Sequence, residues 1–199
     1  MSMIFGVVTL SDSNIQRVLS EPPLIWRVLA PDDPDIYFEC APAPKVSFFS
    51  KLFGQAAPRE LPEIELSSGE GESFDVDKAW HGIHYLLTKS DWGGEPPLDF
   101  IVKGGNEVGA IDVGYGVARA YSSQAVSSIS KSLNAFSEDI LRSRFDAADM
   151  LRLKIYPEIW ARPQEQDDSC GYVIEYAKAL FDFIRKTEKL NLGMVASIT

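Results

Sequence analysis

Residues 74–88, FDVDKAWHGIHYLLT, contain both histidines of the chain together with a carboxylate, a tryptophan and a threonine. In a helix, Asp77, His81, His84 and Thr88 would lie along one flank, because spacings of three, four and seven residues bring side chains to the same side. A carboxylate that orients an imidazole is the arrangement of a general base. The candidate catalytic residues are therefore His84, as the base, and Asp77, as its orienting partner.

Two other interpretations of this flank stay open. The H-x-x-H spacing can place two imidazoles on a metal ion, but the usual helical zinc motif spaces its histidines by four and adds a third ligand. The chain has no third histidine, so we predict no metal site, and no cofactor either. In the purely structural interpretation, His84 is a buried histidine bonded to a carbonyl or carboxylate, beside a solvated His81.

The element that must position these residues is an amphipathic helix over residues 76–87, for which Asp75 is the expected cap. At about 100° per residue, six apolar side chains share a broad face that belongs in the core. They are Val76, Ala79, Trp80, Ile83, Leu86 and Leu87.

Glycine-rich segments supply further candidates, although neither a phosphate loop nor a dinucleotide fingerprint is present. In GYGVARAY, residues 114–121, Tyr115 and Arg119 precede an expected helix and could hold an anionic group near its N-terminus, although an arginine–carboxylate pair is the plainer alternative. In IYPEIW, Tyr156 and Trp160 flank a proline turn, where buried aromatic side chains are the default. Trp80, Tyr115, Arg119, Tyr156 and Trp160 are the candidate ligand-binding residues.

Strands are expected at both ends of the chain, at residues 3–10 and in GMVASI, residues 193–198, which could pair with each other. Helical spacing predicts helices in the following segments: 11–20, capped by Ser11 or Asp12; 122–136, capped by Ser122 or Ser123; 137–145, capped by Ser137; 146–156, capped by Asp146; and a long one through Val173 and Ile184. The fold class is therefore α+β, a helix-rich single domain over residues 1–199 with a small, mainly antiparallel sheet.

Composition narrows the function. The formal net charge of −10 repels phosphate backbones and anionic lipids, so neither nucleic acid nor a membrane is an expected partner. Cys40 and Cys170 form no metal-type pair and too small a set for a disulfide framework, which favours a cytoplasmic protein. No stretch reaches the roughly 20 apolar residues of a membrane helix. Residues 55–73 combine many carboxylates with glycine and serine, so we expect a mobile, solvated acidic loop there.

Five segments in this order resemble the YfbM-like family of bacterial proteins of unknown function: DVDKAWHGIHYLLT, GGNEVG, GYGVARAY, RFDAADM and IYPEIW. The resemblance extends from the N-terminal strand through SFFSKLFG to the C-terminal helix and strand. It implies a single α+β domain in the cytosol and no established activity. His81 is not a position associated with the whole family, and a proline is common where Val117 stands.

Two functions are compatible with these observations. The first is a non-enzymatic domain that binds a protein or a small polar ligand, which the acidic charge and the incomplete catalytic set favour. The alternative is a hydrolase or transferase with His84 as general base, Asp77 as its orienting partner and Arg119 as an anion clamp. That alternative predicts that the three side chains converge on one cleft. The oligomeric state cannot be predicted.

Overall fold

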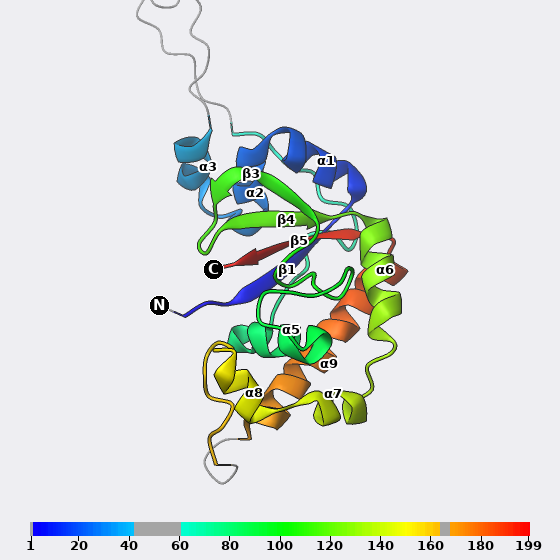
Figure 1. Cartoon of the computed structure of the whole chain (residues 1–199). Coiled ribbons are helices and arrows are strands. Elements are labelled where there is room, and N and C mark those ends of the chain that lie inside the picture. Colours follow the sequence, from blue (N-terminus) through cyan, green and yellow to red (C-terminus); the bar gives the residue numbers. More distant parts are fainter. Residues whose placement is uncertain (1, 42–60, 164–167) are drawn as a thin grey trace, which may run out of the picture.

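A computed structural model describes residues 2–41, 61–163 and 168–199. Its centre is an antiparallel sheet of five strands in the order β2-β1-β5-β4-β3 (Figure 1). The strands are β1 (Phe5–Leu10), β2 (Ser73–Asp75), β3 (Asn106–Asp112), β4 (Val117–Tyr121) and β5 (Gly193–Ile198). The two terminal strands pair from Phe5 with Ile198 to Leu10 with Gly193. The α+β class and the pairing of N- and C-terminal strands are thus confirmed.

Helices cover both faces of the sheet (Figure 1). On one side lie α1 (Asp12–Ser20), α2 (Ile25–Leu29) and α3 (Pro34–Cys40), and on the other lie α5 (Trp80–Thr88), α6 (Ser123–Leu133), α7 (Glu138–Arg144), α8 (Ala147–Arg152) and α9 (Ser169–Lys189). Ser11, Ser122, Ser137 and Asp146 cap α1, α6, α7 and α8 through their side-chain oxygens, as expected.

Two hydrophobic cores, one on each face of the sheet, follow from this layering. In β5, Met194 and Ala196 enter the core shared with α5, α6 and α9, while Val195 enters the core shared with α1 and α2. Successive side chains of a strand point to opposite faces. A strand buried on both faces therefore needs apolar residues throughout, which explains why GMVASI shows no polar alternation.

The sequence did not predict the hairpin of β3 and β4. Arg119, which the sequence places shortly before an expected helix, instead lies within β4. β3 is an edge strand whose register is interrupted between Glu107 and Asp112, and Gly109 lies inside it at φ +61°. Polar residues, a glycine and a bulge hide the strand period in the sequence.

The acidic segment is described only from residue 61 onward; residues 55–60, and all of SFFSKLFG, lie outside the described residues. Glu70 is buried rather than solvated. Its carboxylate accepts the backbone N–H groups of Ser11 and Ser67 and the Asn14 amide, so it secures the start of α1. Burial alone would raise the pKa of Glu70, but these bonds together lower it to about 2.

Candidate functional site

The histidine-bearing helix begins later than expected and is buried on all sides. Asp77 to Ala79 form a 3₁₀ turn, and the α-helix begins at Trp80. Asp75 accepts the backbone N–H of Asp77, but Val76 is the N-cap of the 3₁₀ turn and Ala79 that of the helix, so the prediction that Asp75 caps the helix is wrong. Every residue from Trp80 to Leu87 is buried. Gly82 allows this close packing, since a Cβ there would lie 2.5 Å from the Trp160 ring.

His81 is buried and has a partner for each ring nitrogen. The backbone N–H of Tyr156 donates to Nδ1 over 3.0 Å, and therefore Nε2 carries the proton and donates to the carbonyl of Asp91 over 2.9 Å. Burial lowers the pKa of His81, against the opposing influence of the Asp91 carbonyl and carboxylate. The prediction that His81 is solvated is wrong, because the loop after α5 lies over its side chain.

His84 has no exposed surface and a less complete set of partners. The Thr88 hydroxyl donates its proton to the His84 carbonyl over 2.8 Å. Its oxygen can therefore accept a hydrogen bond from the Nε2–H group of His84, with Oγ1 and Nε2 3.3 Å apart. Nδ1 is buried with no hydrogen-bond partner among the described residues. Burial lowers the pKa of His84 to about 4, helped by the neighbouring His81 ring and opposed by the Gly93 backbone and Asp91. The ring is therefore neutral near pH 7.

The other members of the proposed catalytic set are bonded elsewhere. The Asp77 carboxylate accepts the Tyr172 hydroxyl over 2.9 Å. The Arg119 guanidinium donates to the backbone carbonyls of Ile101 and Val102. Within the described chain, no hydrogen bond connects Asp77 or Arg119 to His84.

Aromatic rings surround His81. Trp80 stacks on it with ring centroids 4.8 Å apart, Trp92 lies at 4.9 Å, and Tyr156 stacks on Trp80 at 5.9 Å. We call Trp80, His81, His84, Thr88 and Trp92 the histidine site. Four pockets on the described part of the chain are lined by other residues, and neither imidazole borders any of them.

Among the described residues, no hydrogen bond or ring contact brings the remaining predicted ligand-binding residues together in one place. Trp160 is buried, and its ring N–H donates to the Ile155 carbonyl over 2.7 Å. Tyr115 lies exposed at the turn between β3 and β4, where its backbone N–H donates to the carbonyl of Ile198. Gly114 and Gly116 on either side of it have positive φ angles, which glycine adopts readily in a tight turn.

A cavity of about 280 Å³ lies on the other side of the loop that covers the histidines. We call residues 89–105 the covering loop. Loop residues form part of the cavity, and β4 and α6 form the rest. Its lining includes Pro97, Asp99, Phe100, Gly105, Tyr121 and Ile129. We call this cavity the Asp99 pocket.

Strand β4 fixes the shape of the Asp99 pocket through alternate residues. Arg119 and Tyr121 point to the same face of the sheet. Arg119 binds the carbonyls of Ile101 and Val102, and the Tyr121 hydroxyl lies 2.6 Å from the carbonyl of Phe100 and 2.8 Å from that of Lys103. Two side chains thus hold four consecutive carbonyls of the turn that carries Asp99, so the pocket is preformed.

Two glycines let the covering loop approach this closely. Gly105 has φ +67°, and a Cβ there would lie 2.9 Å from the Tyr121 ring. A Cβ on Gly94 would lie 2.6 Å from the Thr88 methyl group and 3.1 Å from the Asp99 Cβ. Thr88 and Asp99 therefore flank Gly94, which makes the histidine site and the Asp99 pocket direct neighbours.

Asp99 is the unusual group of this pocket. Its side chain lines the cavity, the residue is only 5% exposed, and no described residue hydrogen-bonds or ion-pairs with its carboxylate. Its backbone carbonyl, by contrast, accepts the N–H groups of Val102 and Lys103. Burial raises the pKa of the neighbouring Tyr121 to about 12; Arg119 opposes this shift and Asp99 adds to it. Tyr121 is thus a neutral phenol.

Sequence reasoning missed Asp99 and Tyr121. Asp99 interrupts the apolar run LDFIV between a Pro-Pro pair and a Gly-Gly pair, and a charge in such a run is a usable signal. Arg119 and Tyr121, two residues apart in a strand, are a second signal once the strand is recognised.

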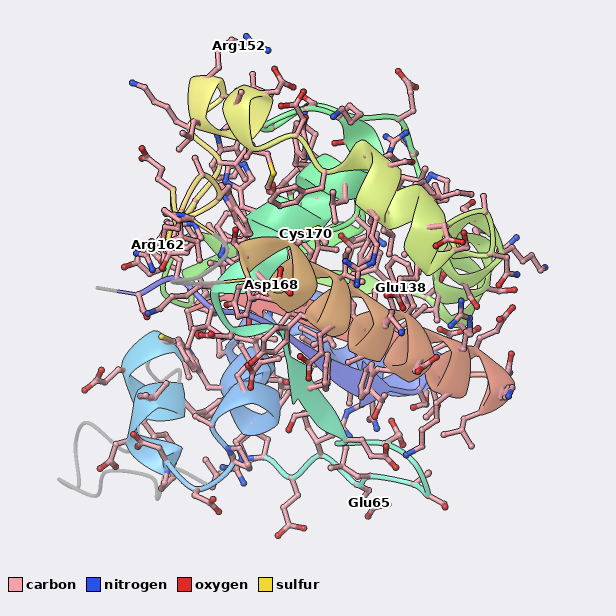
Figure 2. The ribbon with its side chains drawn as sticks, turned by 90° about the horizontal axis from the view of Figure 1, so that it is seen from below. Glu65, Glu138, Arg152, Arg162, Asp168 and Cys170 are labelled. Carbon is pink, nitrogen blue, oxygen red and sulfur yellow. The ribbon has the colours of Figure 1, made fainter. Side chains whose placement is uncertain are left out.

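A larger hollow of about 640 Å³ lies where α9 begins, but its polar side chains already have partners or structural roles. Figure 2 shows Asp168 and Cys170 at the start of α9 and Glu138 near the helix farther along. Asp168 caps α9 by accepting the Gly171 N–H, and Glu138 pairs with Arg142 and Lys178. Burial raises the pKa of the Cys170 thiol, so it is less reactive than a free thiol.

Two further findings concern the described residues alone. No three histidine, cysteine, aspartate or glutamate side chains gather there in a way that could ligate a metal ion. No helix in the described ranges has the length and apolar character needed to span a bilayer.

The fold and site define a small α+β domain, with helices on both faces of an antiparallel sheet and a preformed pocket at one end of α5. A family model described as a domain of unknown function (DUF1877) matches residues 1–197, and the chain belongs to that family. Among solved structures, the chain is similar to YfbM from Escherichia coli, a protein of unknown function. The identity is 15%, the TM-score is 0.63, and the match covers 98% of this chain and 99% of that one. No curated protein matches. The resemblance to the YfbM-like family is thus confirmed.

Proposed function

We propose that this chain is a non-enzymatic domain that binds a small ligand, and that the Asp99 pocket is its binding site. The observation that carries this proposal is a largely buried aspartate that lines an open cavity and whose carboxylate has no hydrogen-bond or ion-pair partner among the described residues. Placing a carboxylate without a partner at a largely buried position lowers the stability of the fold. Such a cost is commonly tolerated where a bound molecule completes the interaction.

The form of the pocket supports the same function. Ligand sites are mostly apolar concavities with a few placed polar groups, and about 280 Å³ is near the small end of their usual range. Because Arg119 and Tyr121 already hold the turn that carries Asp99, little ordering would be needed when a ligand binds. Arg119 therefore acts in this proposal as a positioning residue and not as the anion clamp.

The alternative of a hydrolase or transferase has less support. A general base must reach its substrate, whereas His84 is fully buried and borders none of the four pockets. Asp77, its proposed orienting partner, is bonded to Tyr172. The ligand could also belong to a protein partner. The support for such a partner is the acidic net charge of the chain, which would attract a cationic protein surface. A cytoplasmic location also stays a proposal, supported by the two free cysteines.

The binding site can be tested by screening small fragments while following backbone amide resonances by NMR. Binders should shift the resonances of Gly104, Gly105 and the first turns of α6. Ala125→Phe would place a ring in the cavity and should abolish these shifts, because Ala125 lines the pocket. Gln124→Phe, at an exposed position next to it, is the matched control and should retain them. Fragments that bind equally well to Ala125→Phe, or none that bind to the wild type, would contradict the proposal.

A further inference from the structure

We infer that the ligand of the Asp99 pocket is an organic amine: a protonated ammonium group on a compact apolar stem. This assignment rests on the proposed function and adds the chemical class of the ligand. It uses three properties of the pocket, namely the charge of its buried group, the engagement of the neighbouring cations, and the apolar character of its walls.

The ligand should carry positive charge, because none of the ion pairs among the described residues involves Asp99. Arg119, in β4, donates through its two terminal nitrogens to the carbonyls of Ile101 and Val102 and forms no ion pair with Asp99, although its buried Nε has no hydrogen-bond partner among the described residues. Lys103, four residues after Asp99, is exposed and makes no ion pair with it. An ammonium in the cavity would supply the missing charge-assisted hydrogen bond, which is about twice as strong as a neutral one.

A second acceptor lies beside the carboxylate. The single hydroxyl proton of Tyr121 is directed to the turn carbonyls of Phe100 and Lys103. A phenol oxygen that donates its proton retains lone pairs that can accept. Asp99 and Tyr121 together therefore offer acceptors and no free donor, which suits an ammonium group and disfavours a carboxylate or phosphate.

The rest of the ligand should be small and apolar. Pro96, Pro97, Phe100 and Ile129 contribute hydrocarbon walls, and about 280 Å³ leaves room for only a compact stem. Sugars and nucleotides would bring polar groups that these walls cannot pair. The formal net charge of −10 additionally attracts cations toward the molecule and repels anions.

The test compares three probes with the same stem: cyclohexylmethylamine, cyclohexylmethanol and cyclohexanecarboxylate, titrated calorimetrically into the full chain. We expect the amine to bind at least about tenfold more tightly than the alcohol, equivalent to about 1.4 kcal/mol, and the carboxylate not to bind. Asp99→Asn keeps the shape and should remove the amine's advantage over the alcohol. Glu95→Gln, which removes an exposed carboxylate of the same loop, is the matched control and should preserve the advantage.

The outcomes separate the two proposals. If the alcohol binds as well as the amine and Ala125→Phe abolishes both, the pocket binds ligands but the amine class is wrong. If the amine keeps its advantage in Asp99→Asn, the assignment is overturned as well. If no probe and no fragment binds, both the inference and the proposed function fail.

An additional titration with N-acetyl-lysine methylamide distinguishes the source of the amine. Binding similar to that of cyclohexylmethylamine indicates a lysine side chain of a peptide, and much weaker binding indicates a free amine.

Discussion

The histidine site and the Asp99 pocket are covered by the same loop, residues 89–105, yet they treat buried polar groups in opposite ways. In the histidine site, His81 has partners on both nitrogens and Trp80 and Trp92 fill the space around its ring. In the Asp99 pocket, a carboxylate lines a cavity and has no partner among the residues that the structure describes. Residue types that can do chemistry are therefore concentrated in one region, and the room for a ligand is in the other.

The difference also concerns charge. His84 keeps one unpaired nitrogen, but burial lowers its pKa to about 4, so near pH 7 a neutral group is buried. An unpaired neutral acceptor costs about 1–3 kcal/mol. The Asp99 carboxylate has no partner among the described residues either, but it lines a cavity that a ligand could enter, which makes Asp99 the stronger indication of a ligand.

The largest expected effect tests whether the histidine site is part of the core. Trp80→Ala should lower the free energy of unfolding by about 3–5 kcal/mol, because a large buried aromatic side chain leaves a cavity. Trp92, which also contacts His81 but is 52% exposed, is the matched control. Trp92→Ala should cost about 1 kcal/mol or less. Urea denaturation measures both, and similar costs for the two variants would show that the site is not packed as described.

The second effect concerns how the pocket is held open. Arg119→Met should lower the free energy of unfolding by about 2–3 kcal/mol, because it removes charge-assisted bonds to the carbonyls of Ile101 and Val102. Affinity for any pocket ligand should fall too, although Arg119 does not line the cavity. Arg152→Met, which removes an exposed pair with Asp149, should cost less than about 1 kcal/mol and leave affinity unchanged. Unchanged affinity in Arg119→Met would remove its positioning role.

The third effect is a pH dependence that belongs to the histidine site. The pKa of His84 is about 4 in the folded chain and about 6.5 when unfolded. Above pH 6.5 both states are neutral, and stability does not change. As the pH falls from 6.5 toward 4, the unfolded state takes up the proton first, so stability is lost.

Between pH 7 and pH 5 this loss amounts to about 2 kcal/mol for His84. Denaturation curves at both pH values should show that loss in the wild type and a smaller one in His84→Gln, whose side chain does not titrate. His81, whose pKa is also lowered, contributes in the same direction to both proteins. Equal losses in the two proteins would show that His84 is not held in its neutral form.

The sequence predicted the terminal strands, the serine caps and the long helix α9, because these depend on local patterns. Caps and apolar periods are read over a few residues, as with Ser122 and α6. The strand β3 was not predicted because Gly109 and a bulge interrupt the alternation of its buried and exposed side chains.

The candidate site was less predictable, because its key property is not local. That Asp99 lacks a partner depends on Arg119 and Tyr121 being engaged by carbonyls about 20 residues away in sequence. Likewise, the burial of His81 depends on segments distant in sequence, because Asp91 and Trp92 fold back onto it and the Tyr156 backbone bonds to it. The spacing of polar residues along one side of a helix cannot show whether another segment of the chain will cover them.

The smallest expected effect has the opposite sign from the others. Asp99→Asn should leave the free energy of unfolding unchanged or raise it by up to about 1 kcal/mol without ligand, because a buried unpaired charge is replaced by a neutral group of the same shape. Glu95→Gln, at an exposed position, should lie within about 0.5 kcal/mol of the wild type. Denaturation at pH 7 in the absence of amines measures both. A clear destabilisation by Asp99→Asn would mean that the carboxylate already has a structural partner, and the contrast between the two regions would disappear. Stabilisation would show that the carboxylate is kept at a cost to the fold, as expected of a group that serves binding.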